Sequence, residues 1–448
     1  MNPHGLQVDA DAARWRNWAG DQSFKPAALE RPGSIAEITA VLERAGDLEQ
    51  CVRVAGSGHS FSDILCTDGR LVVLERMRRV LDLDRSSGLV RVQGGITLHE
   101  LSGHLAQHGL ALENLGDIDV QSVAGAISTA THGTGAKLGN IPSQLAALTL
   151  VLADGSTLEC SRERDQEVFR AACVGLGALG VVAEVTLRCV PAFRLEGIEE
   201  PMPLQRTLER FEELVGANEH FEFFAFPHTQ VALTRTNNRT QLPSHPRGRL
   251  AAYLNDVLLT NHAFGFLCGM GRRVPSQIPR INRLVSRLAS ASRRVDRSDR
   301  IFASPRLVKF TEMEYSLPRE RTVEAVRAVL ELVPSMGFAV PFPLEVRTVA
   351  ADDALISTAA GRDSGFVAVH MYRGMEWEPY FRAVEAIMDG LGGRPHWGKR
   401  HFQTAATLRP RYPDWDRFQA VRNRLDPAGR FANAYVKRVL GPPGAPNE

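Results

Sequence analysis

The chain has 448 residues, of which 44% are hydrophobic and 23% are charged. This composition is typical of a folded globular protein and excludes a chain that is disordered throughout. The formal net charge at pH 7 is +2, which excludes the strongly basic balance of many nucleic-acid-binding proteins. Because one hydrophobic core seldom serves so long a chain, we expect two domains.

The cysteines are dispersed and form no C-x-x-C pair, which favours reduced thiols that bind no metal: Cys51, Cys66, Cys160, Cys173, Cys189 and Cys268. Free thiols indicate a reducing compartment. Residues 1–20 contain no apolar segment like that of a signal peptide, and no apolar run approaches the roughly 20 residues that cross a bilayer. We therefore expect a cytoplasmic protein.

Residues 1–190 alternate short helices and strands. The apolar spacing predicts helices at 35–45, 97–109 and 165–175, and strands at 51–56, 71–77, 89–95 and 181–190. Segment 148–160 is predicted to be a hairpin, because Asp154-Gly155 is a strong turn signal.

The pattern changes from about Phe193 onward. Longer amphipathic helices alternate with strands here, with helices predicted at 204–216, 321–333 and 380–391 and strands at 221–226 and 365–372. Alternating elements of both kinds predict an α+β fold with a domain boundary near residue 192.

One stretch is rich in arginine: Arg272, Arg273, Arg280, Arg283, Arg287, Arg293, Arg294, Arg297 and Arg300. An apolar stripe with helical spacing accompanies it, formed by Ile278, Ile281, Leu284, Val285 and Leu288. We interpret the stretch as a solvated surface helix that packs through this stripe. The alternative is a basic amphipathic helix that lies on a membrane surface.

The segment "GLGALG", from Gly175 to Gly180, matches the G-x-G-x-x-G pattern of dinucleotide-binding proteins. That pattern requires a strand before the glycines and a helix after them. Here a predicted helix precedes the glycines and a predicted strand follows them. We therefore do not expect a Rossmann NAD site.

Two segments of small residues point to a cofactor. In "VAGSGHS", at 54–60, Gly56 and Gly58 follow a predicted strand and would let successive backbone N–H groups bind a pyrophosphate. In "SVAGAISTATHGTGAKLG", at 122–139, glycines permit close backbone approach and hydroxyl groups can donate hydrogen bonds. Each segment alone could be a tight turn, but together they indicate a large, flat cofactor with several charges.

Five motifs follow one another along the chain: "GSGHSFSD" (56–63), "SVAGAISTATHGTG" (122–135), "EVR" (345–347), "HWGK" (396–399) and "FANAY" (431–435). In these motifs the chain resembles the sugar-1,4-lactone oxidases and the related alditol oxidases, which are flavoproteins of the vanillyl-alcohol-oxidase fold. The resemblance covers essentially the whole chain and is strongest to bacterial L-gulono- and D-arabinono-1,4-lactone oxidases and dehydrogenases.

The resemblance implies a two-domain fold. Residues 1–192 would form an FAD-binding domain, residues 193–412 a substrate domain that caps it, and residues 413–448 a segment that returns to the FAD domain.

The resemblance also implies that a ring nitrogen of His59 is bonded to the 8α-methyl group of the flavin. Such a bond would hold the flavin ring in place and tune its electronics. The other expected FAD contacts are Val54, Ala55, Gly56, Ser57, Gly58 and Ser60 at the pyrophosphate, Ser122, Gly125, Thr129 and His132 along the ribityl and diphosphate, Val182 on the adenine side, and His396 from the second domain. Without the resemblance, His59 could simply cap a turn.

The expected catalytic residues lie in the second domain. Segment 343–349 reads as a strand, so Glu345 and Arg347 point to the same face. A carboxylate beside a guanidinium suits a polyol, although such a pair could also be an ordinary surface ion pair. The resemblance places Lys399 near the flavin and the substrate, where a cation would stabilise the negative charge that arrives with the hydride.

Three further positions bear on reactivity and specificity. The resemblance places Gly116 where residue size gates the approach of oxygen to the flavin, and glycine there favours an oxidase. Asp117 stands where alditol oxidases have a substrate-contacting serine, and Tyr372 stands where they have threonine. Both departures disfavour simple alditols as substrates.

The implied reaction transfers a hydride from C2 of a sugar-1,4-lactone to flavin N5, while Glu345 or a water that it positions takes the hydroxyl proton. O2 would then reoxidise the flavin and give hydrogen peroxide. Two enzymatic alternatives stay open: an alditol oxidase, and a dehydrogenase that passes electrons to a cytochrome or quinone docked at the arginine-rich stretch. A third alternative is a flavin-binding protein without activity, which the presence of Glu345, Arg347 and Lys399 disfavours.

Overall fold

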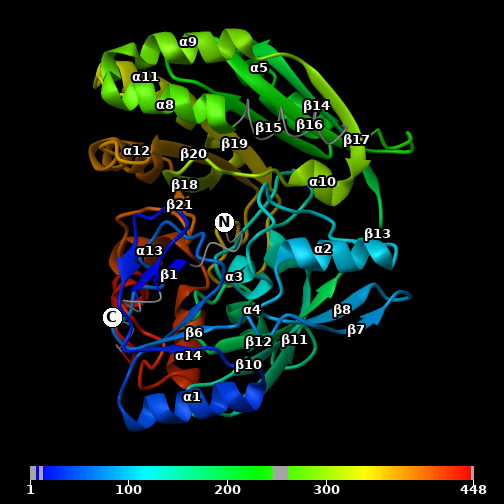
Figure 1. The fold of residues 1–448 in the computed structure, drawn as a ribbon, viewed down its shortest axis with the longest axis vertical. Coiled ribbons are helices and arrows are strands. Elements are labelled where there is room, and N and C mark those ends of the chain that lie inside the picture. Colours follow the sequence, from blue (N-terminus) through cyan, green and yellow to red (C-terminus); the bar gives the residue numbers. More distant parts are fainter. Residues whose placement is uncertain (1–6, 10–13, 246–260, 445–448) are drawn as a thin grey trace.

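The computed structural model describes residues 7–9, 14–245 and 261–444. It consists of two parts stacked along the long axis of the molecule, with α1 (Ile35–Asp47) at one end and α9 (Ile278–Leu288) at the other (Figure 1). Two smaller sheets organise the first part, and one large sheet organises the second. The mixture of helices and sheets confirms the predicted α+β class.

A three-stranded parallel sheet begins the first part, with the order β4 (Ala28–Glu30), β6 (Arg70–Val73) and β5 (Val52–Ala55). Helix α1 connects β4 to β5 and packs against this sheet through Ile38 and Leu42. It begins after Ser34, whose side chain accepts a hydrogen bond from the backbone N–H of Glu37. Segment 56–63 therefore leaves the sheet at the carboxyl end of β5, where parallel sheets usually bind ligands.

A five-stranded antiparallel sheet completes the first part, in the order β11-β10-β12-β8-β7. Its strands are β7 (Val80–Asp84), β8 (Leu89–Gln93), β10 (Leu145–Val151), β11 (Thr157–Ser161) and β12 (Val181–Arg188). Strands β10 and β11 form the predicted hairpin. The associated helices and short strands are α2 (Leu98–Gln107), α3 (Val123–Ser128), α4 (Gln166–Ala172), β1 (Gln7–Asp9), β2 (Arg14–Arg16), β3 (Ser23–Phe24), β9 (Leu110–Ala111) and β13 (Val190–Pro191).

An eight-stranded antiparallel sheet forms the second part, in the order β17-β14-β16-β15-β19-β20-β18-β21. Its strands are β14 (Arg194–Pro203), β15 (His220–Ala225), β16 (Val231–Thr240), β17 (Ser292–Arg297), β18 (Phe310–Pro318), β19 (Leu344–Val349), β20 (Ser364–Tyr372) and β21 (Arg394–Pro395). One face is apolar and packs against α11 (Thr322–Ser335) and α12 (Glu378–Gly390). The other face carries polar and charged side chains, among them Glu222, Glu312 and Arg347. This face lies toward the first part (Figure 1).

The single helix predicted at 204–216 is wrong. The structure has two short helices, α5 (Leu204–Glu209) and α6 (Phe211–Ala217), with Arg210 outside helical geometry between them. Leu208 and Phe211 nevertheless enter the same core. The apolar spacing therefore continues across the break, which is why the sequence reads as one helix.

The arginine-rich stretch is divided among α8 (Phe264–Arg273), α9, β17 and α10 (Ser298–Phe302). In α9, Ile278 and Ile281 are buried, but Leu284 and Leu288 are 48% and 70% exposed. The prediction that the whole apolar stripe packs inward is therefore wrong for these two leucines. The side chain of Asn282 donates hydrogen bonds to two backbone carbonyls beneath α9, and this contact fixes which face of the helix is turned inward.

The segment after residue 412 packs against the first part through α14 (Trp415–Leu425) and α15 (Ala434–Leu440), and the short α13 (Ala405–Leu408) precedes them. We propose the domain limits 1–192, 193–412 and 413–448, with the large sheet beginning at β14. The cysteines of the chain are all free. Within the described part of the chain, no helix combines the length and the apolar character needed to span a membrane.

Candidate cofactor cavity and active site

Two loops of the first part lie in close contact at the predicted cofactor site. Gly56, at the end of β5, lies so near α3 that a Cβ atom on it would be 2.5 Å from the side-chain oxygen of Ser122. That oxygen accepts a hydrogen bond from the N–H of Gly125 and so begins α3. Gly58 has a φ of +71°, a conformation that favours glycine. Small residues are therefore required here for the two loops to meet.

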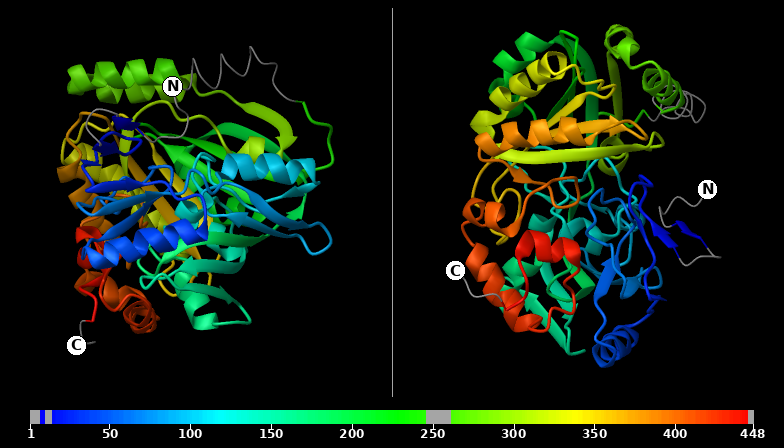
Figure 2. Two further views of the ribbon diagram at one scale, coloured as in Figure 1. Left: turned by 60° about the horizontal axis from the view of Figure 1, so that its bottom comes forward. Right: turned by 90° about the vertical axis from the view of Figure 1, so that its left-hand side faces the viewer.

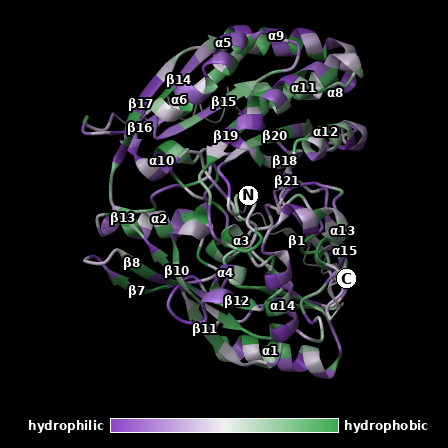
Figure 3. Cartoon of the chain, turned by 180° about the vertical axis from the view of Figure 1, so that it is seen from behind, coloured by the Kyte–Doolittle hydropathy of each residue, from purple (hydrophilic) through white to green (hydrophobic). Residues whose placement is uncertain are grey.

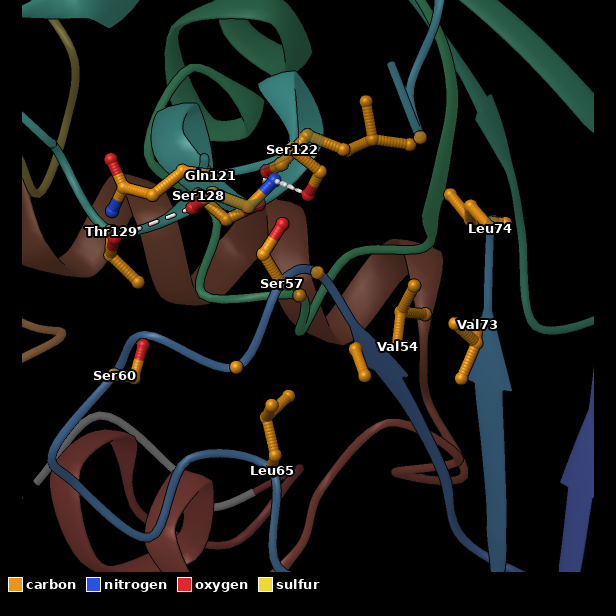
Figure 4. A pocket seen from close by; sticks show the side chains of 18 of the residues that line it. Val54, Ser57, Ser60, Leu65, Val73, Leu74, Gln121, Ser122, Ser128 and Thr129 are labelled. Atoms are coloured by element: carbon orange, nitrogen blue, oxygen red, sulfur yellow. Dashed lines mark hydrogen bonds between the residues drawn. The ribbon is translucent and has the colours of Figure 1, made fainter. Parts of the chain in front are cut away.

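The space beside these loops is a cavity (Figure 4). Most of the residues expected to contact FAD line it: Val54, Ala55, Gly56, Ser57, Gly58, His59, Ser60, Ser122, Gly125, Thr129 and Val182. In Figure 4 the hydroxyl groups of Ser57 and Thr129 and the apolar side chains of Val54 and Leu65 surround the same space. The cavity thus offers polar groups along one part and an apolar wall along another.

Sequence reasoning missed part of this lining. Leu176, Gly177 and Gly180 of the "GLGALG" segment face the cavity, although a helix precedes them and a strand follows, as predicted. Arg53 holds this segment, because its guanidinium donates to the carbonyls of Leu176 and Gly177 at 2.8 and 3.1 Å. It also donates to Ile64 and Phe431. The glycines therefore serve the cavity without forming a Rossmann turn.

His59 is one of the residues that line the cavity. Its Nε2 atom is buried and has no hydrogen-bond partner among the residues that the structure describes. The Trp18 ring stacks on the imidazole at 5.5 Å. Burial, together with the nearby cations Lys309 and Lys399, lowers the pKa of His59 to about 3. The imidazole is therefore neutral at physiological pH, and its unpartnered nitrogen suits attachment to a cofactor in the cavity.

The "HWGK" motif brings the second part against the same loop. The N–H of Phe61 donates to the carbonyl of Gly398 at 2.7 Å, and the Ser62 hydroxyl donates to the carbonyl of Trp397 at 3.2 Å. Lys399 follows directly in the chain. These contacts join the loop that contains His59 to the part of the chain that carries Lys399.

Glu345 and Arg347 lie on that polar face, as predicted, and form an ion pair with each other. The alternation of strand residues places apolar neighbours such as Val346 in the core on the opposite face. The registers bring further charged residues beside them, because Glu222 pairs with Arg235 across β15 and β16, and Glu312 pairs with His370 across β18 and β20.

Arg347 is held by three carboxylates. Its Nε donates to Glu222 at 2.8 Å, and its Nη2 contacts Glu345 and lies 3.4 Å from Asp117. Arg306 also binds Asp117, from the loop that precedes β18. Burial alone would raise the pKa of the Asp117 carboxyl, but Arg347 and Arg306 hold it well below its usual range. Asp117 is therefore ionised.

Glu345 differs from the other carboxyls around Arg347. Burial raises its pKa to about 7, and the charges of Asp117 and Glu222 add to this effect against the attraction of Arg347. Its Oε2 lies 3.9 Å from Nε2 of His370, which in turn lies 3.6 Å from Glu312. A carboxyl group that titrates near pH 7 is suited to take a proton.

Lys399 is paired with a carboxylate that sequence reasoning missed. Its Nζ lies 2.5 Å from Glu312. Burial alone would lower the pKa of Lys399, but Glu312 and Glu314 raise it, so the ammonium keeps its charge. A sequence signal for these partners does exist, since Glu312 and Glu314 lie two residues apart within a strand that has no other charged residue.

His132, His396 and Gly116 lie at the junction of the two parts rather than in the main cavity. His132 approaches Glu314 with 3.2 Å between Nε2 and Oε1, and its ring lies 5.6 Å from that of His396. Burial lowers the pKa of His396 to about 3. A Cβ atom on Gly116 would be 3.1 Å from the carbonyl oxygen of His132. The structure thus groups these three predicted residues beside the charged sheet face.

Tyr372 is the predicted site residue that lies apart from this group. It lines a second cavity with Lys309, Arg272 and Phe266, near the outer end of β20. The guanidinium of Arg272 lies over its ring at 5.8 Å. Tyr372 continues the face that carries His370, but it lies at the strand end, where the sheet face reaches α8.

Comparison with known proteins agrees with this arrangement. The D-arabinono-1,4-lactone oxidase family model matches residues 185–439, and a model of an FAD binding domain matches residues 26–161. An L-gulono-1,4-lactone dehydrogenase of Mycobacterium tuberculosis is 50% identical over 428 residues, which is 96% of this chain and 99% of that protein. The chain belongs to the D-arabinono-1,4-lactone oxidase family. It is an FAD-linked oxidoreductase of the vanillyl-alcohol-oxidase type, as predicted.

Other matches extend over equally large parts of the chain. An L-gulonolactone oxidase of Bos taurus is 36% identical and covers 95% of this chain and 98% of its own length. The structure of a solvent-stable cholesterol oxidase superposes with a TM-score of 0.81 at 19% identity, over 95% of this chain and 97% of that one. The second similarity concerns the fold alone, and together with the FAD-binding domain model it confirms the predicted vanillyl-alcohol-oxidase type of fold.

Proposed function

We propose that this enzyme oxidises a sugar-1,4-lactone of the L-gulono-1,4-lactone type at C2, with O2 as the acceptor of the electrons. The observation that carries the proposal is the buried Glu345–Arg347 pair on the sheet face that adjoins His59 and the cofactor cavity. The names of the similar lactone oxidases and dehydrogenases support the choice of substrate.

Arg347 would bind and orient the substrate. Its Nε and Nη2 atoms are directed toward carboxylates, so the side chain cannot rotate freely. Because Nε and Nη2 face these carboxylates, Nη1 is the nitrogen that would donate to a lactone oxygen. Because the guanidinium is planar, fixing its other nitrogens also fixes the direction of this donor.

Glu345 would accept the proton of the C2 hydroxyl group. Its pKa of about 7 means that the ionised form is available at neutral pH and that the protonated form is also stable there. His370 and Glu312 extend from Glu345 at 3.9 and then 3.6 Å and offer a route by which the proton can leave.

Bound FAD would supply the two-electron acceptor, taking the hydride from C2 at N5 and later passing both electrons to O2 to give hydrogen peroxide. Lys399 would balance the negative charge that arrives with the hydride, as its half-buried ammonium is held by Glu312. Asp117 would contact the polyol tail of the lactone or hold Arg347 and Arg306 in place. Tyr372 has no role in this proposal beyond the second cavity.

We further propose that FAD is bonded covalently to His59. The neutral imidazole and its unpartnered Nε2 support this bond. Residues 54–60 would hold the pyrophosphate, Ser122, Gly125, Thr129 and His132 the ribityl chain and diphosphate, Val182 the adenine side, and His396 the flavin ring. After acid precipitation the protein should stay yellow and fluoresce on a denaturing gel, whereas free FAD in the supernatant would contradict the bond. His59→Ala should hold FAD non-covalently or lose it.

A dehydrogenase is the second candidate, because the Mycobacterium tuberculosis relative bears that name. It would pass electrons to a cytochrome or a quinone instead of O2. An alditol oxidase is a third, which Asp117 disfavours. Lactones and alditols, each assayed for peroxide formation and for cytochrome c reduction, separate these candidates. Faster turnover of xylitol or sorbitol than of L-gulono- and D-arabinono-lactone would refute the proposed substrate.

We also propose that the enzyme is cytoplasmic. Its free cysteines support this location, because thiols stay reduced in a reducing compartment.

A further inference from the structure

The outer surface of α8 and α9 combines exposed apolar side chains with arginines. On α9 the exposed residues are spaced i, i+3, i+4, i+7 and i+8, so they share one face: Arg280, Arg283, Leu284, Arg287 and Leu288. On α8 and the residue after it, Phe266, Met270, Arg273 and Val274 are exposed as well. We call these nine residues the α8–α9 patch. Phe266 and Leu288 are 66% and 70% exposed, which is unusual for such large apolar side chains.

The opposite faces of both helices are firmly attached to the protein. Phe264 of α8 packs edge-on against Phe342 with 5.0 Å between ring centroids. Asn282 of α9 donates to the carbonyls of Val340 and Pro227 at 2.9 and 3.2 Å. The apolar residues of the patch therefore cannot turn inward without breaking these contacts. Both helices lie on the outside of the molecule, away from its centre (Figure 2).

The patch carries positive charge without acidic neighbours in the sequence. No Asp or Glu occurs between Asp256 and Asp296. Within the described ranges, no carboxylate forms an ion pair with Arg273, Arg280, Arg283 or Arg287, and the side chain of Arg280 binds Gln277 instead. A surface adapted only to water usually mixes both signs of charge. Figure 3 shows hydrophilic and hydrophobic positions following one another along α8 and α9.

We propose that the α8–α9 patch docks this enzyme onto a membrane surface that contains anionic phospholipids. The apolar side chains would enter the headgroup region, and the arginines would bind lipid phosphates. A second copy of the chain fits less well, because a two-fold contact would bring two positive patches together. The patch lies at one end of the long axis, so docking leaves the far end of the molecule in water (Figure 1).

Docking would also place the second cavity next to the lipid. Phe266 belongs both to the patch and to the lining of that cavity, and Lys309 lies within it. Lys309 contacts Trp18, whose ring stacks on His59. The surface that we assign to the membrane is therefore connected by direct contacts to His59 in the lining of the cofactor cavity. The proposal does not depend on which sugar lactone is oxidised.

Co-sedimentation of the flavin-loaded enzyme with vesicles tests the proposal. Vesicles of phosphatidylcholine mixed with phosphatidylglycerol should bind the enzyme at least about tenfold more tightly than pure phosphatidylcholine, and added salt should weaken the binding. The double variants Phe266→Ser/Leu288→Ser and Arg283→Gln/Arg287→Gln should each reduce binding about tenfold or more. Flavin content and thermal midpoint should stay those of the wild type, since all four side chains are exposed.

A matched control changes exposed residues far from the patch. The variant Leu48→Ser/Arg424→Gln removes an exposed leucine and an exposed arginine and should bind vesicles as the wild type does. Equal binding to neutral and anionic vesicles, or equal loss in the control variant, would overturn the proposal. The wild type could instead form a dimer that does not bind vesicles, while both patch variants are monomeric. That result would overturn the proposal and make the patch an interface between two copies of the chain.

Discussion

Asp117 and Arg347 form an ion pair, with 3.4 Å between Oδ2 and Nη2, across the boundary between the two parts of the protein. Asp117 follows β9 in the first part, and Arg347 lies within β19 of the large sheet. Arg306 binds the same carboxylate from the loop before β18. These ion pairs hold the polar face of the large sheet against the first part, which contains the cofactor cavity. The charged residues of the site should therefore behave as one unit.

Loss of the charge at Lys399 should slow flavin reduction. Lys399→Met removes the cation that Glu312 holds, and a well-placed charge of this kind contributes about 3 kcal/mol, or roughly two orders of magnitude in rate. Stopped-flow reduction by a lactone measures the effect. The double variant Lys399→Met/Glu345→Gln should lose less than the product of the two single losses. Reduction within a few-fold of wild type in all of these variants would mean that the active-site assignment is wrong.

Arg347→Lys should impair the enzyme although it keeps the positive charge. An ammonium cannot reproduce the planar donor that contacts Glu222, Glu345 and Asp117 while leaving one nitrogen for the substrate. We expect the rate of flavin reduction to fall about a hundredfold, with flavin content unchanged. Arg327→Lys on the exposed side of α11 is the control and should reduce normally. Wild-type rates in Arg347→Lys would show that only the charge matters.

The rate of flavin reduction should rise with pH through about 7. Glu345 must be ionised to accept a proton, and its pKa is about 7. Below that pH the carboxyl is mostly protonated, and the rate should fall about tenfold for each pH unit. Glu345→Gln should be slow at every pH and should lose this dependence. A wild-type profile that is flat between pH 5.5 and 8.5 would exclude Glu345 as the base; this range is about 1.5 pH units on either side of the expected value.

The same raised pKa affects stability. Between the ordinary pKa of a glutamate and about 7, Glu345 is protonated in the folded protein and ionised in the unfolded chain. Its contribution to the free energy of unfolding is therefore full at low pH and is lost as the pH rises through 7. Glu345→Gln should consequently gain roughly 1–3 kcal/mol relative to wild type on going from pH 5 to pH 8. Denaturant unfolding at both pH values measures this difference. A free energy of unfolding of Glu345→Gln that does not rise relative to that of wild type between pH 5 and pH 8 would contradict the prediction.

Gly116→Ala should affect reoxidation of the flavin by O2 more than its reduction by the lactone. The new Cβ would be 3.1 Å from the carbonyl oxygen of His132, so a small local shift is needed. If oxygen passes this position, reoxidation by O2 should slow about tenfold or more while anaerobic reduction stays nearly intact. Equal slowing of both half-reactions would indicate a packing role for Gly116 instead.

Gly56→Ala should impair FAD loading. Its Cβ would meet the Ser122 oxygen at 2.5 Å, which forces the two cofactor loops apart and costs about 1–3 kcal/mol. Gly103→Ala is the matched control, because nothing lies within 4 Å of a Cβ atom on this residue of α2 and alanine favours a helix. We expect low flavin content only in the first variant. Full flavin content in Gly56→Ala would show that the loops tolerate separation.

The sequence could predict what depends on local spacing. Glu345 and Arg347 lie two residues apart in a strand, so their common face followed directly. Their neighbours Glu222 and His370 could not be predicted, because the order of the strands in the large sheet decides which residues lie side by side. In the same way, the orientation of Leu284 and Leu288 depends on the contact of Asn282 with carbonyls from two other segments, which helical periodicity does not contain.

Arg53 and Asn433 connect the cofactor loop, residues 56–63, and its flanking residues to a segment near residue 430 that is translated much later. Arg53 donates to the carbonyl of Phe431, which lies 378 residues further along the chain, and Asn433 donates to the carbonyls of Ile64 and Cys66 at 3.0 and 2.9 Å. On the ribosome, the loop that contains His59 emerges long before these partners are translated. The nascent polypeptide lacks these contacts until residues 431–433 are made, and we expect FAD to bind only after that point.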